Sequence, residues 1–265
     1  MATQNAPRTA RQRARAELTR EITEEARRQL AATGADGLSL RAVARELGMV
    51  SSALYRYYPS RDDLLTVLII DAYNAIGEAA ETAIVGAQPA VGAKPAARGI
   101  ARARWLAACR AIRAWAIDHP HEYALIYGSP VPGYQAPAAT IGPAARVPLA
   151  FVGVLAAGIA DGEVTIGPLT AGEVTAGTGP GAGPLTGVLA DQTAALSAAL
   201  SLDPATAPAA ALVPPDMLVR GVMAWAQLFG VISFELFGQF VGSFEPADAF
   251  FAYTISQSAT LVGLP

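Results

Sequence analysis

Eight side chains between residues 39 and 61 have the types and the spacing to contact DNA. Serine hydroxyls and backbone amides at a helix start can bind phosphate, and arginine can donate to a phosphate or to the edge of a base. Tyrosine hydroxyls can donate to phosphates, and small residues at a helix start let that helix lie deep in a groove. The eight residues, which predict a DNA-binding surface, are Ser39, Arg41, Ser51, Ser52, Ala53, Tyr55, Tyr57 and Arg61.

Two short helices joined by a tight turn would hold these side chains on one surface. Ser39 can cap the first helix, in which apolar residues recur at helical spacing. Gly48 supplies the turn. A second helix is predicted to begin at Ser51 or Ser52 and to end before Pro59. This arrangement is a helix-turn-helix, whose second helix enters the major groove of DNA.

Apolar periodicity predicts helices along most of the remaining chain, and hence an all-α fold. A helix ending at Thr33, with Gly34 as its stop, completes a three-helix DNA-binding domain, and its stripe is Leu18, Ile22, Ala26 and Leu30. Further helices are predicted at about 61–85, 98–118, 121–127, the end of 140–160, 215–240 and 246–262. Loops are predicted at 86–96, 128–137 and, in a stretch rich in Gly and Pro, at about 162–187.

Composition and charge place a polyanion-binding region at the N-terminus of a cytoplasmic protein. A single cysteine excludes an internal disulfide, the first 28 residues lack the apolar run of a signal peptide, and the apolar run 147–160 is too short to span a bilayer. Residues 1–65 contain 11 Arg against 8 Asp and Glu, a net charge of +3, whereas the other 200 contain 8 basic and 14 acidic residues, a net charge of −6. We therefore expect the basic end to meet DNA and no part of the chain to meet a membrane.

The stretch from about residue 15 to residue 65 resembles the DNA-binding domain of TetR-family transcriptional regulators. The resemblance rests on Ser39, Ala42, Ala44, Leu47-Gly48, Leu54-Tyr55-Arg56-Tyr57-Tyr58 and Arg61-Asp62-Asp63-Leu64-Leu65. Met49, Tyr57 and Arg61 stand where Val, His and Lys are common in that family. The resemblance implies that Arg41 and Ser51 to Ala53 face bases, and that Tyr55, Tyr57 and Arg61 hold phosphates.

The C-terminal part is similar, more loosely, to the regulatory domain of one TetR branch with a Trp-His-Gly signature. Trp225 to Gly230 carries that similarity, with Phe229 in place of the signature His, and 123–137 is similar to the Pro-Gly-Tyr loop of the same branch. The resemblance implies two domains, 1–65 with a flexible basic arm at 1–15, and 66–265 for regulation and dimerisation. The last two helices would form the dimer, which would place two recognition helices roughly 34–36 Å apart on a pseudo-palindromic operator.

The apolar, aromatic body of the chain predicts a repressor that a small apolar or aromatic ligand releases from its operator. Aromatic side chains suit the walls of such a pocket, and the candidates are Trp115, Tyr123, Tyr127, Tyr134, Trp225 and Phe229. The apolar stripe that includes Trp225 and Phe229 also fits a helix core or a dimer seam. Glu235 in the same helix is expected to cap or to form a hydrogen bond rather than to catalyse a reaction.

Two other classes of function remain alternatives. One is a ligand-independent architectural or protein-regulated DNA-binding protein, for which the Gly/Pro-rich loop could dock a partner. The other is an enzyme, against which stands the lack of a readable catalytic set. His119, His121 and Glu122 form a weak set of metal ligands, and no phosphate-binding loop is readable in 177–183. We expect no catalytic residue, no metal and no cofactor.

Overall fold

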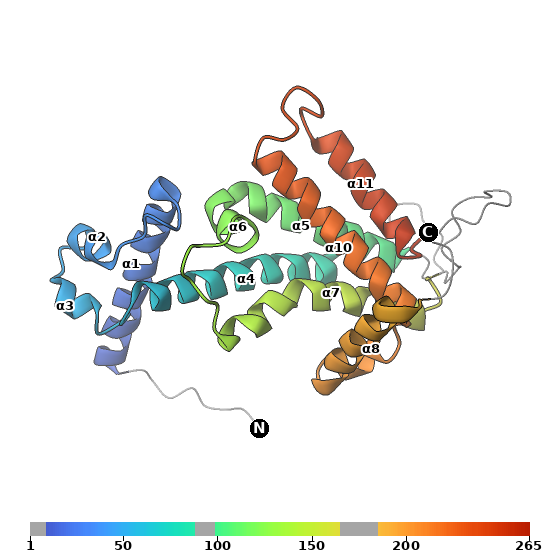
Figure 1. The fold of residues 1–265 in the computed structure, drawn as a ribbon, viewed down its shortest axis with the longest axis horizontal. Coiled ribbons are helices and arrows are strands. Elements are labelled where there is room, and N and C mark those ends of the chain that lie inside the picture. The colour runs from blue at the N-terminus through green and yellow to red at the C-terminus, as the bar shows by residue number, and fades with distance from the viewer. Residues whose placement is uncertain (1–8, 88–98, 165–184) are drawn as a thin grey trace. The chain divides into compact units, whose positions relative to one another are not determined.

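The regular structure of the protein is helical wherever the computed structural model describes it, in residues 9–87, 99–164 and 185–265 (Figure 1). The all-α prediction is confirmed. The chain forms two compact units, one of Met1–Asn74 with His119–Ala144 and the other of Ala75–Asp118 with Ala145–Pro265. We call them the first and the second unit. The predicted domains 1–65 and 66–265 stay a prediction, and the first unit also takes in a segment from the middle of the chain.

Helix α1 (Ala10–Thr33) begins earlier than predicted, because Thr9 and Gln12 form a capping box. The Thr9 amide donates to Gln12 Oε1 over 2.8 Å, and the Gln12 amide donates to Thr9 Oγ1 over 3.3 Å. Residues 10–15 of the predicted flexible arm are therefore helical, whereas residues 1–8 lie outside the described residues. Gly34 ends the helix with φ +72°, as predicted.

The core of the first unit is made by α1, α2 (Leu40–Glu46), α3 (Ser51–Leu54) and the start of α4 (Arg61–Gly86). Ile22, Val43, Leu54 and Leu64 are completely buried in it. An ion pair of 2.6 Å between Arg27 and Asp71 joins α1 to α4. The predicted capping box at the start of α4 is present, since the Ser60 amide donates to Asp63 Oδ2 and the Asp63 amide donates to Ser60 Oγ.

Three short elements complete the first unit. Helix α6 (Pro120–Tyr127) packs on α1 and is followed by a loop and the 3-10 turn η1 (Ala138–Thr140). The hydroxyl of Tyr134, in the loop, lies 2.9 Å from Thr66 Oγ1 of α4, and the Tyr73 hydroxyl donates to the carbonyl of Ile126. These contacts explain why a segment distant in sequence belongs to the same packing unit.

The second unit contains the end of α4, α5 (Ile100–Asp118), most of α7 (Ile141–Ala160), α8 (Gly187–Leu202), α9 (Ala207–Ala210), α10 (Pro215–Leu236) and α11 (Asp248–Leu261). Helix α10 packs against α8, α11 and α5. The apolar pattern of α8 is weak and its side chains are mostly exposed, which is why periodicity did not predict it. Most of the predicted loop 162–187 lies outside the described residues.

Helix α10 ends four residues before the predicted boundary. Gly238 adopts a left-handed conformation with φ +76°, and the Gln239 amide donates over 2.8 Å to the Phe234 carbonyl. Both features close the last turn of a helix and turn the chain away from its axis. A turn from Phe237 to Ala247 then leads into α11, so the two predicted C-terminal helices are both present but shorter.

Polar side chains on neighbouring helices hold the second unit together. Arg113 of α5 donates to both carboxylate oxygens of Glu235 of α10, over 2.7 and 2.5 Å, and to Asp248 of α11 over 2.8 Å. The hydrogen bonding expected of Glu235 is thus confirmed. Trp105 Nε1 donates to Ser258 Oγ over 3.0 Å, which ties α5 to α11. Charge-assisted hydrogen bonds of this kind fix the helices at a defined register.

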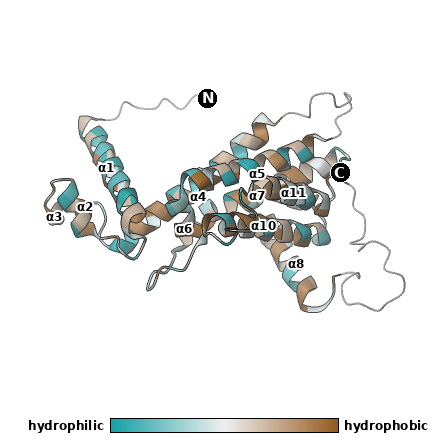
Figure 2. Ribbon diagram, turned by 90° about the horizontal axis from the view of Figure 1, so that it is seen from above, coloured by the Kyte–Doolittle hydropathy of each residue, from teal (hydrophilic) through white to brown (hydrophobic). Residues whose placement is uncertain are grey.

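Helix α10 and the segment Ala138–Ala160 are long and apolar enough, by length and composition, to cross a membrane. Figure 2 shows α10 mostly in the hydrophobic colour and α1 mostly in the hydrophilic one. Core helices of soluble proteins pass the same test, and Phe151, Leu155, Leu228 and Ile232 of these two helices are buried. The two helices are therefore weak evidence for a membrane.

Candidate DNA interface and regulatory cavity

The helix-turn-helix is built from local backbone interactions. Ser39 Oγ accepts a hydrogen bond of 3.4 Å from the Ala42 amide and so caps α2. Gly48 has φ +65°, a conformation that side chains with a Cβ rarely adopt, and the Met49 amide donates over 2.8 Å to the Ala44 carbonyl. The predicted turn is present, and it directs the chain into α3.

The polar face of α2 and α3 is accessible, whereas their apolar face is buried. Arg41, Ser52 and Tyr55 are exposed, and Ser39, Ser51, Ala53 and Tyr57 are half-buried. Tyr58 is buried in the core, as expected of it. The side chains predicted to face bases therefore share one accessible region of the first unit, at the start of the two short helices.

Tyr57 is positioned by the N-terminal part of α1. The Arg15 guanidinium lies 5.5 Å from the centroid of the Tyr57 ring, a cation–π distance. Sequence reasoning did not link these two residues, because they are 42 positions apart. The contact brings an arginine of α1 next to a predicted phosphate contact.

Arg61 has a structural partner set inside the first unit. Its Nε donates over 3.2 Å to the Leu38 carbonyl, and one of its terminal nitrogens donates over 2.7 Å to the Ala35 carbonyl. Both carbonyls belong to the loop between α1 and α2. These two hydrogen bonds occupy the guanidinium group that was predicted to contact a phosphate. The phosphate contact of Arg61 stays a prediction.

Two exposed residues beside α3 were not among the predicted site residues. Val50, the N-cap of α3, is 70% exposed, and Arg56 is exposed directly after the helix. Val50 is an apolar residue in the turn before the recognition helix, at a position where a core residue is expected. Its residue type at this place is the signal that sequence reasoning could have used. An apolar group there can contact a thymine methyl, and an arginine can contact a phosphate.

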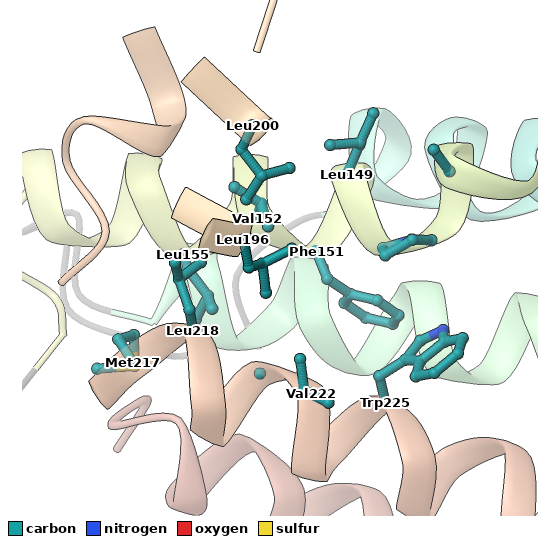
Figure 3. A pocket seen from close by; sticks show the side chains of 13 residues that line it. Leu149, Phe151, Val152, Leu155, Leu196, Leu200, Met217, Leu218, Val222 and Trp225 are labelled. Atoms are coloured by element: carbon teal, nitrogen blue, oxygen red, sulfur yellow. The ribbon is translucent and has the colours of Figure 1, made fainter. Parts of the chain in front are cut away.

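A cavity of about 280 Å³ lies in the second unit between α7, α8 and α10 (Figure 3). Apart from the indole nitrogen of Trp225, the side chains that line it are apolar. They belong to Ala145, Pro148, Leu149, Phe151, Val152, Leu155, Leu196, Leu200, Met217, Leu218, Gly221, Val222 and Trp225. Cavities with this lining bind apolar small molecules.

Of the six aromatic residues predicted for the ligand pocket, Trp225 is the one that lines this cavity. Tyr123 and Tyr127 pack against each other in the first unit, where burial raises the pKa of Tyr127, and Tyr134 contacts Thr66. Trp115 and Phe229 are buried in the second unit, with the Phe229 ring 5.6 Å from that of Trp225. The structure thus distributes the six over two units, and their ligand role stays a prediction.

Helices α10 and α11 and the turn between them expose large apolar side chains. Val222, Met223, Phe234, Phe237, Val241, Phe244 and Tyr253 are each about half exposed or more. Large apolar side chains that stay exposed on neighbouring elements are typical of protein interfaces. The same helix α10 therefore lines the cavity on one side and exposes apolar residues on another.

Comparisons with known proteins agree with this architecture. A family described as "Bacterial regulatory proteins, tetR family" matches residues 22–68, and "Tetracyclin repressor-like, C-terminal domain" matches residues 105–257, which is more than half of the chain. The HTH-type transcriptional regulators Rv1816 of Mycobacterium tuberculosis and Mb1846 of Mycobacterium bovis are each 46% identical over 148 residues. These alignments cover 56% of this chain and 59% of each relative, so the chain spans about three fifths of the length of the curated relatives it matches.

Solved structures extend the similarity to nearly the whole chain. A protein assigned as regulatory, SCO4313, is 31% identical, with a TM-score of 0.62 over 95% of this chain and 100% of that one. A protein assigned to the tetR family from Shewanella sp. PV-4 shares the fold at 16% identity, with a TM-score of 0.50 over 92% of this chain and 95% of that one. Together with the helix-turn-helix, these matches show that the chain belongs to the TetR family of DNA-binding transcriptional regulators.

Proposed function

We propose that this protein is a cytoplasmic, homodimeric repressor that leaves a pseudo-palindromic operator when a small apolar ligand enters the cavity of the second unit. The observation that carries the proposal is the position of α10. This one helix contributes Leu218, Gly221 and Trp225 to the cavity wall and also carries the exposed Met223 and Phe234. A ligand that moves α10 would thereby change the surface through which two copies associate.

The DNA contacts proposed for each protomer lie on α2, on α3 and in the turns next to α3. Arg41 and Ser51 to Ala53 are proposed to face bases, together with Val50. Tyr55, Tyr57 and Arg56 are proposed to contact phosphates. Arg61 is proposed to reach a phosphate only by releasing one of its carbonyl partners.

Dimerisation through α10, α11 and their connecting turn is supported by the exposed apolar side chains of this region. Phe234 is 53% exposed, so replacing it should not disturb the core of a protomer. We expect Phe234→Glu to dissociate the dimer, measured by sedimentation, and to lower operator affinity. Val85→Glu, a change of the same kind at an exposed residue of α4, is the matched control and should leave the dimer intact.

The decisive experiment is fluorescence anisotropy on DNA from upstream of the protein's own gene, compared with random duplex over a salt series. A preference on the order of 10³-fold or more for the upstream DNA supports a sequence-specific repressor. Equal, steeply salt-dependent binding to both duplexes would contradict it and would favour the architectural alternative. Addition of apolar compounds to the bound complex then tests release, and a complex that no such compound weakens would contradict the ligand mechanism.

A further inference from the structure

We infer, on the basis of the ligand-release function proposed above, that the effector is an uncharged, mainly aliphatic molecule of about nine non-hydrogen atoms with one hydrogen-bond acceptor for the indole N–H of Trp225. The inference concerns the same cavity between α7, α8 and α10, and it names the chemistry of its ligand. Three independent features of the cavity lead to it: its lining, its volume and its one polar atom.

The lining excludes a charged ligand. None of the lining side chains that the structure describes carries a charge, and none of them except that of Trp225 carries an N–H or O–H group. A carboxylate or ammonium group placed there would lose its hydration without gaining a partner. The most exposed of these lining side chains, Leu196 and Val222, are apolar as well, so no cation stands among them to hold an anionic head group.

The volume sets the size of the ligand. A cavity of about 280 Å³ corresponds to about nine units of the ~30 Å³ that a water molecule occupies in the liquid. A methylene group is of similar size. A ligand that fills the cavity therefore has about nine non-hydrogen atoms, and longer chains would have to extend past the mouth or displace α8.

Trp225 supplies the one polar contact. Its Nε1 is buried and has no acceptor among the described residues, whereas Nε1 of the buried Trp105 donates to Ser258. A buried N–H that has lost its hydrogen bond to water and gained no other acceptor is unfavourable. Buried indoles normally have a hydrogen-bond partner. An acceptor on the ligand would remove this penalty, so the cavity should bind a ligand with an acceptor more tightly than a ligand of the same shape without one.

The geometry also indicates how the contact would form. Trp225 is only partly buried as a residue although its Nε1 is covered, and its ring packs at 5.6 Å on that of Phe229. Figure 3 shows Trp225 and Phe151 at the same end of the cavity. Because Nε1 is covered, the indole would have to turn to present it to a ligand, and this turn would change the fluorescence of Trp225.

The test is binding of 2-alkanones by the full-length protein, measured by calorimetry and by tryptophan fluorescence. The series runs from about six to about twelve non-hydrogen atoms and is matched by 2-methyl-1-alkenes, in which C=CH₂ replaces C=O, and by carboxylates of equal length. We expect the Kd to fall about fourfold per methylene until the cavity is full, and then to stop falling. At the best length the ketone should bind roughly five- to tenfold more tightly than its alkene isostere.

Two variants separate the size of the cavity from its polar contact. Trp225→Phe keeps an aromatic ring but removes the N–H, so it should abolish the advantage of the ketone over the alkene while the dependence on length persists. Gly221→Ala adds a methyl group to the cavity wall, where among the described residues it would meet Leu155 Cδ1 at 3.7 Å. It should shorten the best ligand by about one methylene and leave the ketone advantage unchanged.

Several outcomes would overturn the inference. They are equal binding of ketone and alkene to the unaltered protein, a ketone advantage that survives in Trp225→Phe, and tightest binding by the carboxylate. The comparison of ketone with alkene and the comparison with the carboxylate use the unaltered protein. The inference can therefore be tested even if the Trp225→Phe variant does not fold. Anisotropy on operator DNA is measured in parallel. Ligands that bind as expected but do not release DNA would contradict the proposed mechanism of release and not the chemistry of the cavity.

Discussion

The helix-turn-helix and the region around α10 present opposite surfaces. The first exposes Arg41, Ser52 and Arg56 around a small apolar core, and the second exposes Phe234, Phe237 and Val241 beside the half-buried ion pair of Arg113 and Glu235. A surface of cations and hydroxyls suits a polyanion, whereas exposed phenylalanines suit another apolar surface. The difference teaches that the polar groups of this protein face outward where DNA binding is proposed and face one another where helices of the second unit meet.

The two regions also differ in the sequence distance over which their polar contacts act. Ser39 with Ala42 and Ser60 with Asp63 span three residues, whereas Arg113 with Glu235 spans 122. Local contacts form as soon as the helix forms, and they stabilise one element at a time. Long-range contacts form only when three helices have met, so they should make the second unit unfold cooperatively.

The largest effect is expected from removal of the Arg113 cation. Arg113 and Glu235 are 15% and 19% exposed, and Arg113→Met would leave the Glu235 carboxylate without a partner. We expect a loss of about 2–4 kcal/mol in the free energy of unfolding, measured with urea. Arg20→Met is the control, because Arg20 pairs with Glu17 and Glu24 at the surface, where solvent screens the charges, and its loss should change stability far less.

A double variant sharpens this prediction. In Arg113→Met with Glu235→Leu no buried charge is left alone, so the loss should be smaller than in Arg113→Met alone. Equal losses in the single and the double variant would mean that the packing of the arginine stem, not its charge, holds the helices. A loss below about 1 kcal/mol in Arg113→Met would remove the contrast between the two regions.

The next effect concerns DNA and not stability. Arg41→Ala removes an exposed guanidinium proposed to read a base, and it should cost about 1–3 kcal/mol of operator binding and relax sequence preference. Tyr57→Phe should weaken binding to all sequences by a smaller and uniform factor. Anisotropy measures both, with Arg28→Ala as a control of equal charge on α1, where Arg28 pairs with Glu25. Equal losses in Arg41→Ala and Arg28→Ala would mean that only net charge matters.

A pair of glycines, one from each region, gives effects of opposite sign. Gly48→Ala places a Cβ on a backbone with φ +65° and should cost about 1–2 kcal/mol, although no described residue other than its chain neighbours comes within 4 Å of the new methyl group. Gly221→Ala replaces a glycine inside α10 and should gain about 0.5–1 kcal/mol. Thermal unfolding measures both. A stabilising Gly48→Ala would show that the turn tolerates another conformation.

The smallest effect is a difference in pH dependence between two aspartates. Burial raises the pKa of Asp71 in spite of nearby Arg27, so its contribution to stability is present below the unfolded value near 3.9 and is lost as pH rises through the folded pKa. Arg113 lowers the pKa of Asp248, so its contribution is present above about 3.9 and is lost as pH falls through the lowered pKa.

Urea midpoints of Asp71→Asn and Asp248→Asn, measured from about pH 3 to about pH 7, test these directions. Relative to the unaltered protein, Asp71→Asn should gain stability as pH rises. The deficit of Asp248→Asn should shrink as pH falls. Parallel curves for the two variants would contradict the opposite directions of the two pKa values.

Much of the helix-turn-helix was predictable, because its structure depends on neighbouring residues. Ser39, Gly48 and Ser60 act through hydrogen bonds or backbone angles within a few positions, and each adopts the predicted place. The role of Arg61 was less predictable, since its carbonyl partners Ala35 and Leu38 are more than 20 positions away. Prediction therefore weakened inside the same domain as soon as a long-range partner was involved.

The cavity was less predictable than the DNA-binding surface. Aromatic residue type suggested six pocket residues. Of these six, Tyr123 and Tyr134 pack in the first unit, and Trp225 is the one that lines the cavity. Leu196 and Leu200 belong to α8, a helix with a weak apolar pattern that was not predicted. Residue type says that a side chain avoids water, but it does not say which other side chains will surround it.

The sequence by itself determined the all-α fold, the turn at Gly48, the capping box at Ser60 and the family of the protein, because each of these depends on periodicity or on residues close together in the chain. Only the tertiary structure decided that Arg113 joins three helices, that α8 closes a cavity against α7 and α10, and that the N–H of Trp225 finds no acceptor in the part of the chain that the structure describes. These features depend on which surfaces meet after the helices pack, and packing is a property of the whole chain that no local pattern contains.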